Sequence, residues 1–207
     1  MSTTPFTPEY FIEQMCLEGN SPLTWISNAI MFHRSAHILF QLSRTREKQF
    51  LTFARSQPLP LPGETVAREL KGEVLAAAND MQLWRVSMFL LAIALENLLK
   101  ARLLENGIEL VNSYGKLDKK RFQSHNLNHF ARLANLKLCE DDTKILEWLT
   151  RWLMWQGRYP VPTEWEQLEK FQSMRVGTLG EQWEKSFALY DHILSIHPSI
   201  ITQKNTG

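Results

Sequence analysis

Cysteine is scarce in this chain of 207 residues, and its scarcity excludes two classes of small protein. Cys16 and Cys139 are the two cysteines, they lie far apart, and no CxxC motif occurs. A disulfide framework needs several paired cysteines and a zinc ribbon needs closely spaced ones, so we expect neither. Two isolated thiols fit a reducing, cytoplasmic compartment.

An excess of charge of one sign is also lacking. The chain has 23 lysines and arginines against 22 aspartates and glutamates, for a formal net charge of +1. Because a strong basic excess is typical of nucleic-acid-binding domains, the composition argues against a dedicated one and leaves local RNA contact open. With 44% hydrophobic residues, the chain has the composition of a globular domain with a sizeable core.

Long hydrophobic runs are absent as well. The longest nearly apolar run, residues 86–95, contains Ser87 and is flanked by Arg85 and Glu96. A transmembrane helix needs about 20 apolar residues, so we expect a core helix here and no membrane association. The first residues also lack the basic and apolar regions of a signal peptide.

Apolar residues recur at helical spacing along almost the whole chain, without a convincing β alternation, and this pattern predicts an all-α protein. Asn79–Asp80 is expected to separate two helices, with Asp80 capping the second. The expected helices cover residues 8–17, 22–44 with a continuation over 46–54, 64–78, 81–105, 127–136, 140–155, 163–172 and 179–196.

A proline-rich segment, residues 58–63, is the clearest internal boundary, because proline removes a backbone donor and disfavours helical geometry in the residue before it. We therefore divide the chain into a helical N-terminal extension, residues 1–62, and a helical bundle, residues 63–207. A stiff connector is the favoured interpretation of the segment, and a proline-rich ligand for a partner domain is the alternative.

Three short polar signatures lie within the apolar sequence: ALENLLK at 94–100, HNL at 125–127 and GRYP at 157–160. Glu96 and Lys100 are four residues apart, which places them on one helix face in the favourable order for an ion pair. Asn126 is a natural N-cap for the helix that follows it. Gly157 and Pro160 are expected to end the preceding helix.

The order of these signatures resembles the HEPN family (higher eukaryotes and prokaryotes nucleotide-binding domain). The resemblance rests on ALExLLKxxLLxxG, on the HNL that follows and on a tryptophan-rich helix ending in RYP, and it covers roughly residues 82–196. It implies an antiparallel helical bundle, often a homodimer, and it leaves the N-terminal extension outside the match.

Many HEPN proteins are metal-independent ribonucleases of toxin or antiviral systems, whose motif leaves about four to six residues between an arginine and the histidine that follows it. Three residues separate Arg121 from His125 and seven separate it from His129, and neither spacing fits. The leading interpretation is therefore a non-catalytic binding or regulatory protein without catalytic residues, associated with a nucleotide or RNA in a stress or defence system. The alternative is a ribonuclease with a displaced site built from Arg121, His125 and His129.

The polar residues of the signatures have two interpretations. Together they could face a phosphate-containing ligand, because cations beside a ring hydroxyl recognise phosphate, although a glutamate among them opposes an anion. The favoured interpretation is a buried network that fixes the connections between helices, with Arg158 paired to Glu96. The residues concerned are Glu96, Lys100, His125, Asn126, Arg158 and Tyr159.

Histidine pairs are weak candidates for a metal site. His33 and His37, like His125 and His129, are four residues apart and could share a helix face. Zinc needs a third and usually a fourth ligand, and no acidic motif accompanies either pair, so we expect neither a metal nor another cofactor.

A tryptophan stripe is the last candidate. Trp148, Trp152 and Trp155 lie at i, i+4 and i+7 on one expected helix. This spacing favours the core or a dimer interface over a surface that stacks on nucleic-acid bases. A helical adaptor that docks a different protein on this stripe is a further alternative.

Overall fold

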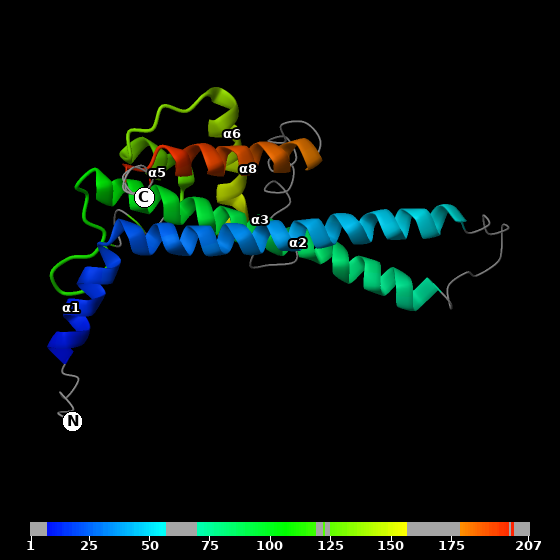
Figure 1. The fold of residues 1–207 in the computed structure, drawn as a ribbon, viewed down its shortest axis with the longest axis horizontal. Helices are drawn as coiled ribbons and strands as arrows, with labels where there is room; N and C mark the ends of the chain where they lie inside the picture. The colour runs from blue at the N-terminus through cyan, green and yellow to red at the C-terminus, as the bar shows by residue number, and fades with distance from the viewer. Residues whose placement is uncertain are drawn as a thin grey trace.

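The computed structural model of the protein describes residues 8–56, 70–118, 122, 125–156, 179–198 and 200. Within these ranges the chain is helical, apart from loops and one isolated antiparallel bridge between Val111 and Leu117. The predicted all-α class is therefore confirmed. Figure 1 shows the arrangement of the helices along two long central ones. In chain order the helical elements are α1 (Pro8–Gly19), α2 (Pro22–Ser56), α3 (Leu70–Glu105), α5 (Leu127–Leu133), α6 (Glu140–Arg151), the π-helical turn η1 (Trp152–Gln156) and α8 (Leu179–Ser195).

The expected interruption at Asn79–Asp80 is wrong, because α3 runs through both residues as one helix. Each of these residues costs less than about 0.7 kcal/mol relative to alanine inside a helix, a penalty that tertiary packing readily outweighs. Helix α2 is likewise continuous from Pro22 to Ser56. The proline segment 58–63 and the expected helix 163–172 lie outside the described residues.

The second half of α3 forms the centre of the molecule. Its sequence is apolar on nearly every side, as expected of a helix surrounded by others, and residues such as Leu91, Leu95 and Leu99 are fully buried. Helix α2 packs along α3 more extensively than any other pair of helices does. Ala29 and Ala36 of α2 are fully buried, and these small side chains allow a close approach of the two helices.

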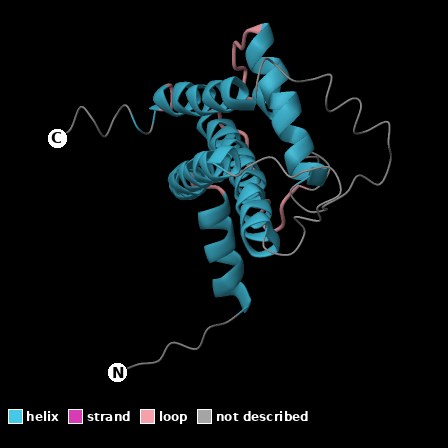
Figure 2. Cartoon of the chain, turned by 90° about the vertical axis from the view of Figure 1, so that its right-hand side faces the viewer, coloured by secondary structure: helices cyan, strands magenta, loops and turns pink. Residues whose placement is uncertain are grey.

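A corner joins α1 to α2, and Asn20 fixes it. The Asn20 amide accepts hydrogen bonds from the backbone N–H groups of Leu110 and Val111 at 3.0 and 2.9 Å and donates one to the Val111 carbonyl at 2.8 Å. Gly19 lies so close to Val111 that an added Cβ would be 2.4 Å from Cγ2 of that residue. Figures 1 and 2 show that α1 leaves the bundle at a steep angle to α2.

No helix in the described part of the chain is long and apolar enough to cross a membrane. The tryptophan stripe faces inward where its side chains are described: Trp148 and Trp152 are buried in the core and meet edge to face, with ring centroids 5.8 Å apart. Both therefore lie in the chain's own core, and neither offers a docking surface on this chain. The side chain of Trp155 lies outside the described residues.

Candidate functional site

The structure brings three of the six predicted polar residues together. Nζ of Lys100 lies 2.5 Å from Oε1 of Glu96, as the helical spacing predicts. Nδ1 of His125 lies 3.0 Å from Oε2 of the same carboxylate. Glu96 and Lys100 are only 5% and 7% exposed, so this is a largely buried ion pair with a histidine at its rim.

Aromatic rings close the other side of Lys100. Its ammonium lies 5.0 Å from the ring centroid of Trp25 and 5.7 Å from that of Phe130. A cation over an aromatic face is attracted to it, and more strongly when water is excluded. The lysine therefore connects α2, α3 and α5, and its charge is compensated within the chain.

Asn126 serves the backbone of the next helix. Its side-chain oxygen accepts a hydrogen bond from the His129 N–H at 3.0 Å, which confirms the predicted N-cap. Thr150 of α6 supports the same turn, because its hydroxyl accepts a hydrogen bond from the Leu127 N–H at 3.1 Å. Just before the cap, His125 has a φ of 47°, an uncommon value for a residue other than glycine.

Three residues named by the sequence lie outside the described residues: Arg121, Arg158 and Tyr159. The expected pair between Arg158 and Glu96 and the displaced ribonuclease site therefore remain predictions. The described parts of the signatures instead form structural contacts at helix junctions.

A cleft that the sequence does not predict lies between α2 and α8. Its volume is about 610 Å³, within the range of small-molecule sites. Aromatic rings form its floor: Phe40 stacks on Trp183 with centroids 3.7 Å apart, and Trp183 meets Phe187 at 4.6 Å. The lining residues are His33, His37, Phe40, Gln41, Arg44, Thr45, Lys48, Trp183, Glu184, Phe187, Ala188 and Asp191.

Charged side chains line the two walls of this cleft. Arg44 and Lys48 come from α2, and Glu184 and Asp191 come from α8. The guanidinium of Arg44 lies 5.7 Å from the ring centroid of Phe40, so a cation stands directly above the aromatic floor. The cleft therefore has cationic side chains on one wall and carboxylates on the other.

His33 lies at the inner end of the cleft. Its ring stacks on Tyr190 with centroids 3.9 Å apart and planes 3° from parallel. Among the described residues, neither His33 Nε2 nor the Tyr190 hydroxyl has a hydrogen-bond partner, and both atoms are buried. Burial lowers the pKa of His33, and burial raises that of Tyr190, so both groups favour the neutral form.

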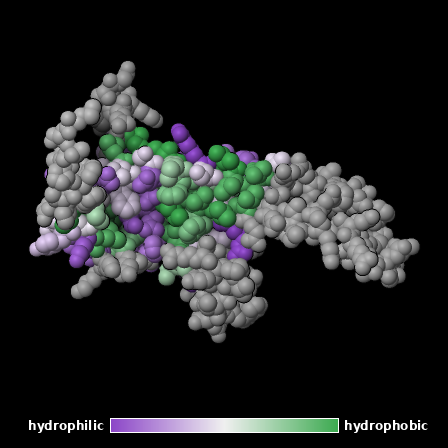
Figure 3. Space-filling model, turned by 90° about the horizontal axis from the view of Figure 1, so that it is seen from below, coloured by the Kyte–Doolittle hydropathy of each residue, from purple (hydrophilic) through white to green (hydrophobic). Residues whose placement is uncertain are grey.

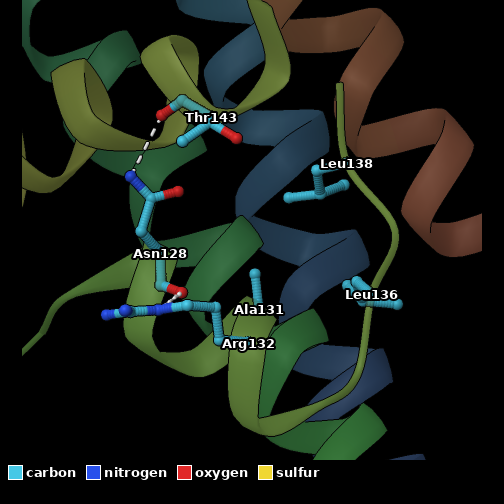
Figure 4. Close-up of a pocket in the computed structure, with 6 residues that line it drawn as sticks. All are labelled: Asn128, Ala131, Arg132, Leu136, Leu138 and Thr143. Carbon is cyan, nitrogen blue, oxygen red and sulfur yellow. Dashed lines mark hydrogen bonds between the residues drawn. The ribbon is translucent and has the colours of Figure 1, made fainter. Parts of the chain in front are cut away.

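A second, smaller cavity of about 420 Å³ lies beside α5 and α6 (Figure 4). Its polar groups bond to one another: the Asn128 amide donates to the Thr143 carbonyl at 3.0 Å, and Nε of Arg132 donates to the Asn128 carbonyl at 3.3 Å. Ala131, Leu136 and Leu138 supply the apolar lining. Arg132 is the lysine or arginine of this lining, whereas Arg44 and Lys48 both line the cleft between α2 and α8.

Metal-binding chemistry has no support in the described ranges, where no group of three or more histidine, cysteine or acidic side chains could hold a metal ion. His33 and His37 contact aromatic rings of α8 instead, at 4.8 and 5.5 Å from the ring of Phe187. Cys16 and Cys139 are free thiols. The chain matches no known protein family, no curated protein and no solved structure.

Proposed function

We propose that this chain is a non-catalytic, HEPN-like helical binding protein whose ligand is a nucleotide, free or within RNA, held in the cleft between α2 and α8. The observation that carries the proposal is the combination of an aromatic floor with the cations of Arg44 and Lys48 on one wall. Aromatic side chains supply an apolar lining for a base, and cations hold phosphate. Glu184 and Asp191 on the opposite wall can accept hydrogen bonds from sugar hydroxyls or base amino groups.

The buried pair of Glu96 and Lys100 is the weaker candidate for binding this ligand. The Lys100 ammonium already contacts the Glu96 carboxylate and two aromatic rings, so an anion would have to displace a buried partner. Separating a buried ion pair costs about 3–5 kcal/mol. On the cleft wall Arg44 is half-buried and Lys48 is exposed, so an anion can approach both cations from solvent.

Binding is tested by titrating the purified chain with AMP, ATP and GTP, and separately with a short single-stranded RNA, while following tryptophan fluorescence. We expect saturable binding that Arg44→Ala weakens about tenfold or more, the loss of about 1.4 kcal/mol of a charge-assisted hydrogen bond. Lys144→Ala is the matched control, because this exposed lysine lies on α6 and pairs with Glu140. Absence of saturation with every nucleotide and with RNA would refute the proposal.

The ribonuclease alternative is tested by incubating the protein with mixed single-stranded RNA in the absence of metal. We expect the RNA to remain intact, because neither His125 nor His129 has the spacing from Arg121 that the ribonuclease motif requires. Robust cleavage that disappears in Arg121→Ala or His125→Ala would replace the non-catalytic proposal with the displaced site.

The wider setting is part of the same proposal. A cytoplasmic protein of a stress or defence system is what the resemblance to HEPN proteins and the two free cysteines support. A homodimer is also implied by the resemblance.

A further inference from the structure

The side chains of the cleft between α2 and α8 are ordered along its length. Phe40 stacks on Trp183, and the guanidinium of Arg44 lies 5.7 Å from the ring centroid of Phe40. His33 lies seven residues before Phe40 on α2, and its ring stacks on Tyr190. Seven residues of α-helix rise by about 10 Å. The cleft therefore has a cationic end near Arg44 and a second end, about two helical turns away, near His33.

Asp191 supplies a carboxylate to this second end. It follows Tyr190 on α8 and lines the cleft. Burial lowers the pKa of His33, and Asp191 lies close enough to oppose this shift. Because Asp191 is exposed, a ligand in the cleft can reach its carboxylate oxygens. An ionised carboxylate only accepts hydrogen bonds, so this end of the cleft favours a ligand that presents donors.

Ala188 separates the two carboxylates of the α8 wall. Glu184, Ala188 and Asp191 are spaced by four and three residues, which places them on one face of the helix. Glu184 directly follows Trp183, at the level of the Phe40 ring, whereas Asp191 lies seven residues and about 10 Å further along the helix. The methyl group of Ala188 is the smallest side chain of the lining. It leaves room for a flat ring between the two ends of the cleft.

Guanine is the base whose donors match a carboxylate. Its ring N1–H and its exocyclic amino group are adjacent and parallel donors, so they can bond to both oxygens of one carboxylate, as an arginine does. Adenine and cytosine present one amino group beside a ring nitrogen that is an acceptor, and uracil presents one N–H between two carbonyl groups. An acceptor that faces a carboxylate has no partner there, so these three bases fit less well.

The face of the molecule shown in Figure 3 is less suited to a nucleotide. Seen from below, hydrophobic residues gather over the middle of the described surface. Phosphate is held by cations that donate hydrogen bonds to it. The cleft, with its cationic end, therefore suits a nucleotide better than this apolar area does.

We propose that the cleft selects guanine nucleotides, with the phosphate at Arg44 and Lys48 and the base at Asp191, whose carboxylate accepts hydrogen bonds from N1–H and the amino group. This inference rests on the proposed function, because it requires a nucleotide in the cleft. The two ends are about 10 Å apart by helical rise, which is comparable to the reach of a nucleotide from its phosphate to the edge of its base. Phe187 lies between them on the α8 wall and supplies an apolar lining beside the base.

The first test compares GMP with AMP, which carry the same charge and have nearly the same size, by isothermal titration calorimetry of the full chain. We expect GMP to bind about tenfold more tightly, the factor that corresponds to one charge-assisted hydrogen bond. IMP keeps N1–H and lacks the amino group, so its affinity should lie between the other two. Equal affinities for GMP and AMP overturn the selectivity and leave the proposed function in place. If neither binds, the selectivity is also overturned, and the proposed function then depends on the RNA titration.

The second test substitutes Asp191. An asparagine side chain has one acceptor and one donor, which match the amino group and the ring nitrogen of adenine. We therefore expect Asp191→Asn to bind AMP at least as tightly as GMP. Glu184→Gln is the matched control, because it removes the same charge from the same wall, and it should change both affinities by one factor and keep the preference for GMP. Circular-dichroism spectra of both variants should equal that of the wild type. A preference for GMP that persists in Asp191→Asn, or that Glu184→Gln also removes, overturns the role assigned to Asp191.

Discussion

The carboxylate of Glu96 bridges Lys100, one turn later on α3, and His125, which lies beyond a loop: Oε1 is 2.5 Å from Nζ of Lys100 and Oε2 is 3.0 Å from Nδ1 of His125. A single carboxylate thus joins the central helix to the start of α5. Because the lysine is 7% exposed, removal of the carboxylate would leave a buried cation without its ionic partner.

Replacement of Glu96 by alanine should therefore destabilise the fold by about 3 kcal/mol, the cost of leaving one member of a buried ion pair. Urea unfolding followed by circular dichroism measures the loss. Adding Lys100→Met to Glu96→Ala should recover much of it, because the unpaired charge is then removed. Glu147→Ala is the control, since Glu147 is exposed on α6. Equal stabilities of the single and double variants would contradict the role assigned to the buried charge.

The hydrogen bonds of Asn20 at the corner between α1 and α2 can be removed in part or in full by substitution. Asn20→Ala removes three hydrogen bonds to Leu110 and Val111, so we expect a loss of about 1–3 kcal/mol. Asn20→Asp keeps the acceptor of the two N–H groups and loses only the donor to the Val111 carbonyl, so its loss should be smaller. Thermal unfolding gives the order. A loss for the aspartate variant as large as that for alanine would show that the two N–H contacts contribute nothing.

The sequence predicts contacts between residues that are close along the chain, but not contacts between residues that are far apart. The Asn126 cap and the ion pair between Glu96 and Lys100 are local, and helical spacing alone predicts both of them. The contact of Lys100 with Trp25 joins α3 to a residue near the start of α2, and no local pattern encodes it.

The cleft is even harder to predict from the sequence. It joins His33 and Phe40 to Trp183 and Asp191, which come together only after α2 and α8 pack side by side. The spacing of His33 and His37 predicts a shared helix face, but it does not identify the aromatic rings of α8 that both histidines contact. The continuity of α3 through Asn79–Asp80 has the same origin, since a weak local preference yields to packing.

His33 predicts a pH dependence of stability. Burial lowers its pKa, an effect that outweighs the raising influence of Asp191 on α8 and adds to the lowering influence of His37 and Arg34 on α2. Between the folded pKa and the unfolded value of about 6.5, the unfolded chain binds more protons. The free energy of unfolding should therefore fall as the pH drops below about 6.5.

Removing this histidine should reduce the effect. We expect His33→Gln to flatten the dependence of the free energy of unfolding between pH 7 and 5, measured by urea titration at each pH. His192→Gln is the matched control, because His192 is exposed on α8. If both variants lose stability as steeply as the wild type, His33 is not the group that titrates.

The Thr150 side chain connects α6 to the start of α5. Its hydroxyl donates to the Leu146 carbonyl at 2.8 Å and accepts from the Leu127 N–H at 3.1 Å, and the threonine is buried. Thr150→Val has nearly the same shape but leaves a buried N–H without a partner, which should cost about 1–3 kcal/mol. Thr150→Ser keeps the hydroxyl and should lose much less of this bond. Amide hydrogen exchange at Leu127 distinguishes the cause, because we expect faster exchange in the valine variant and near-native exchange in the serine variant. Unchanged protection of that amide in Thr150→Val would mean that α5 starts independently of α6.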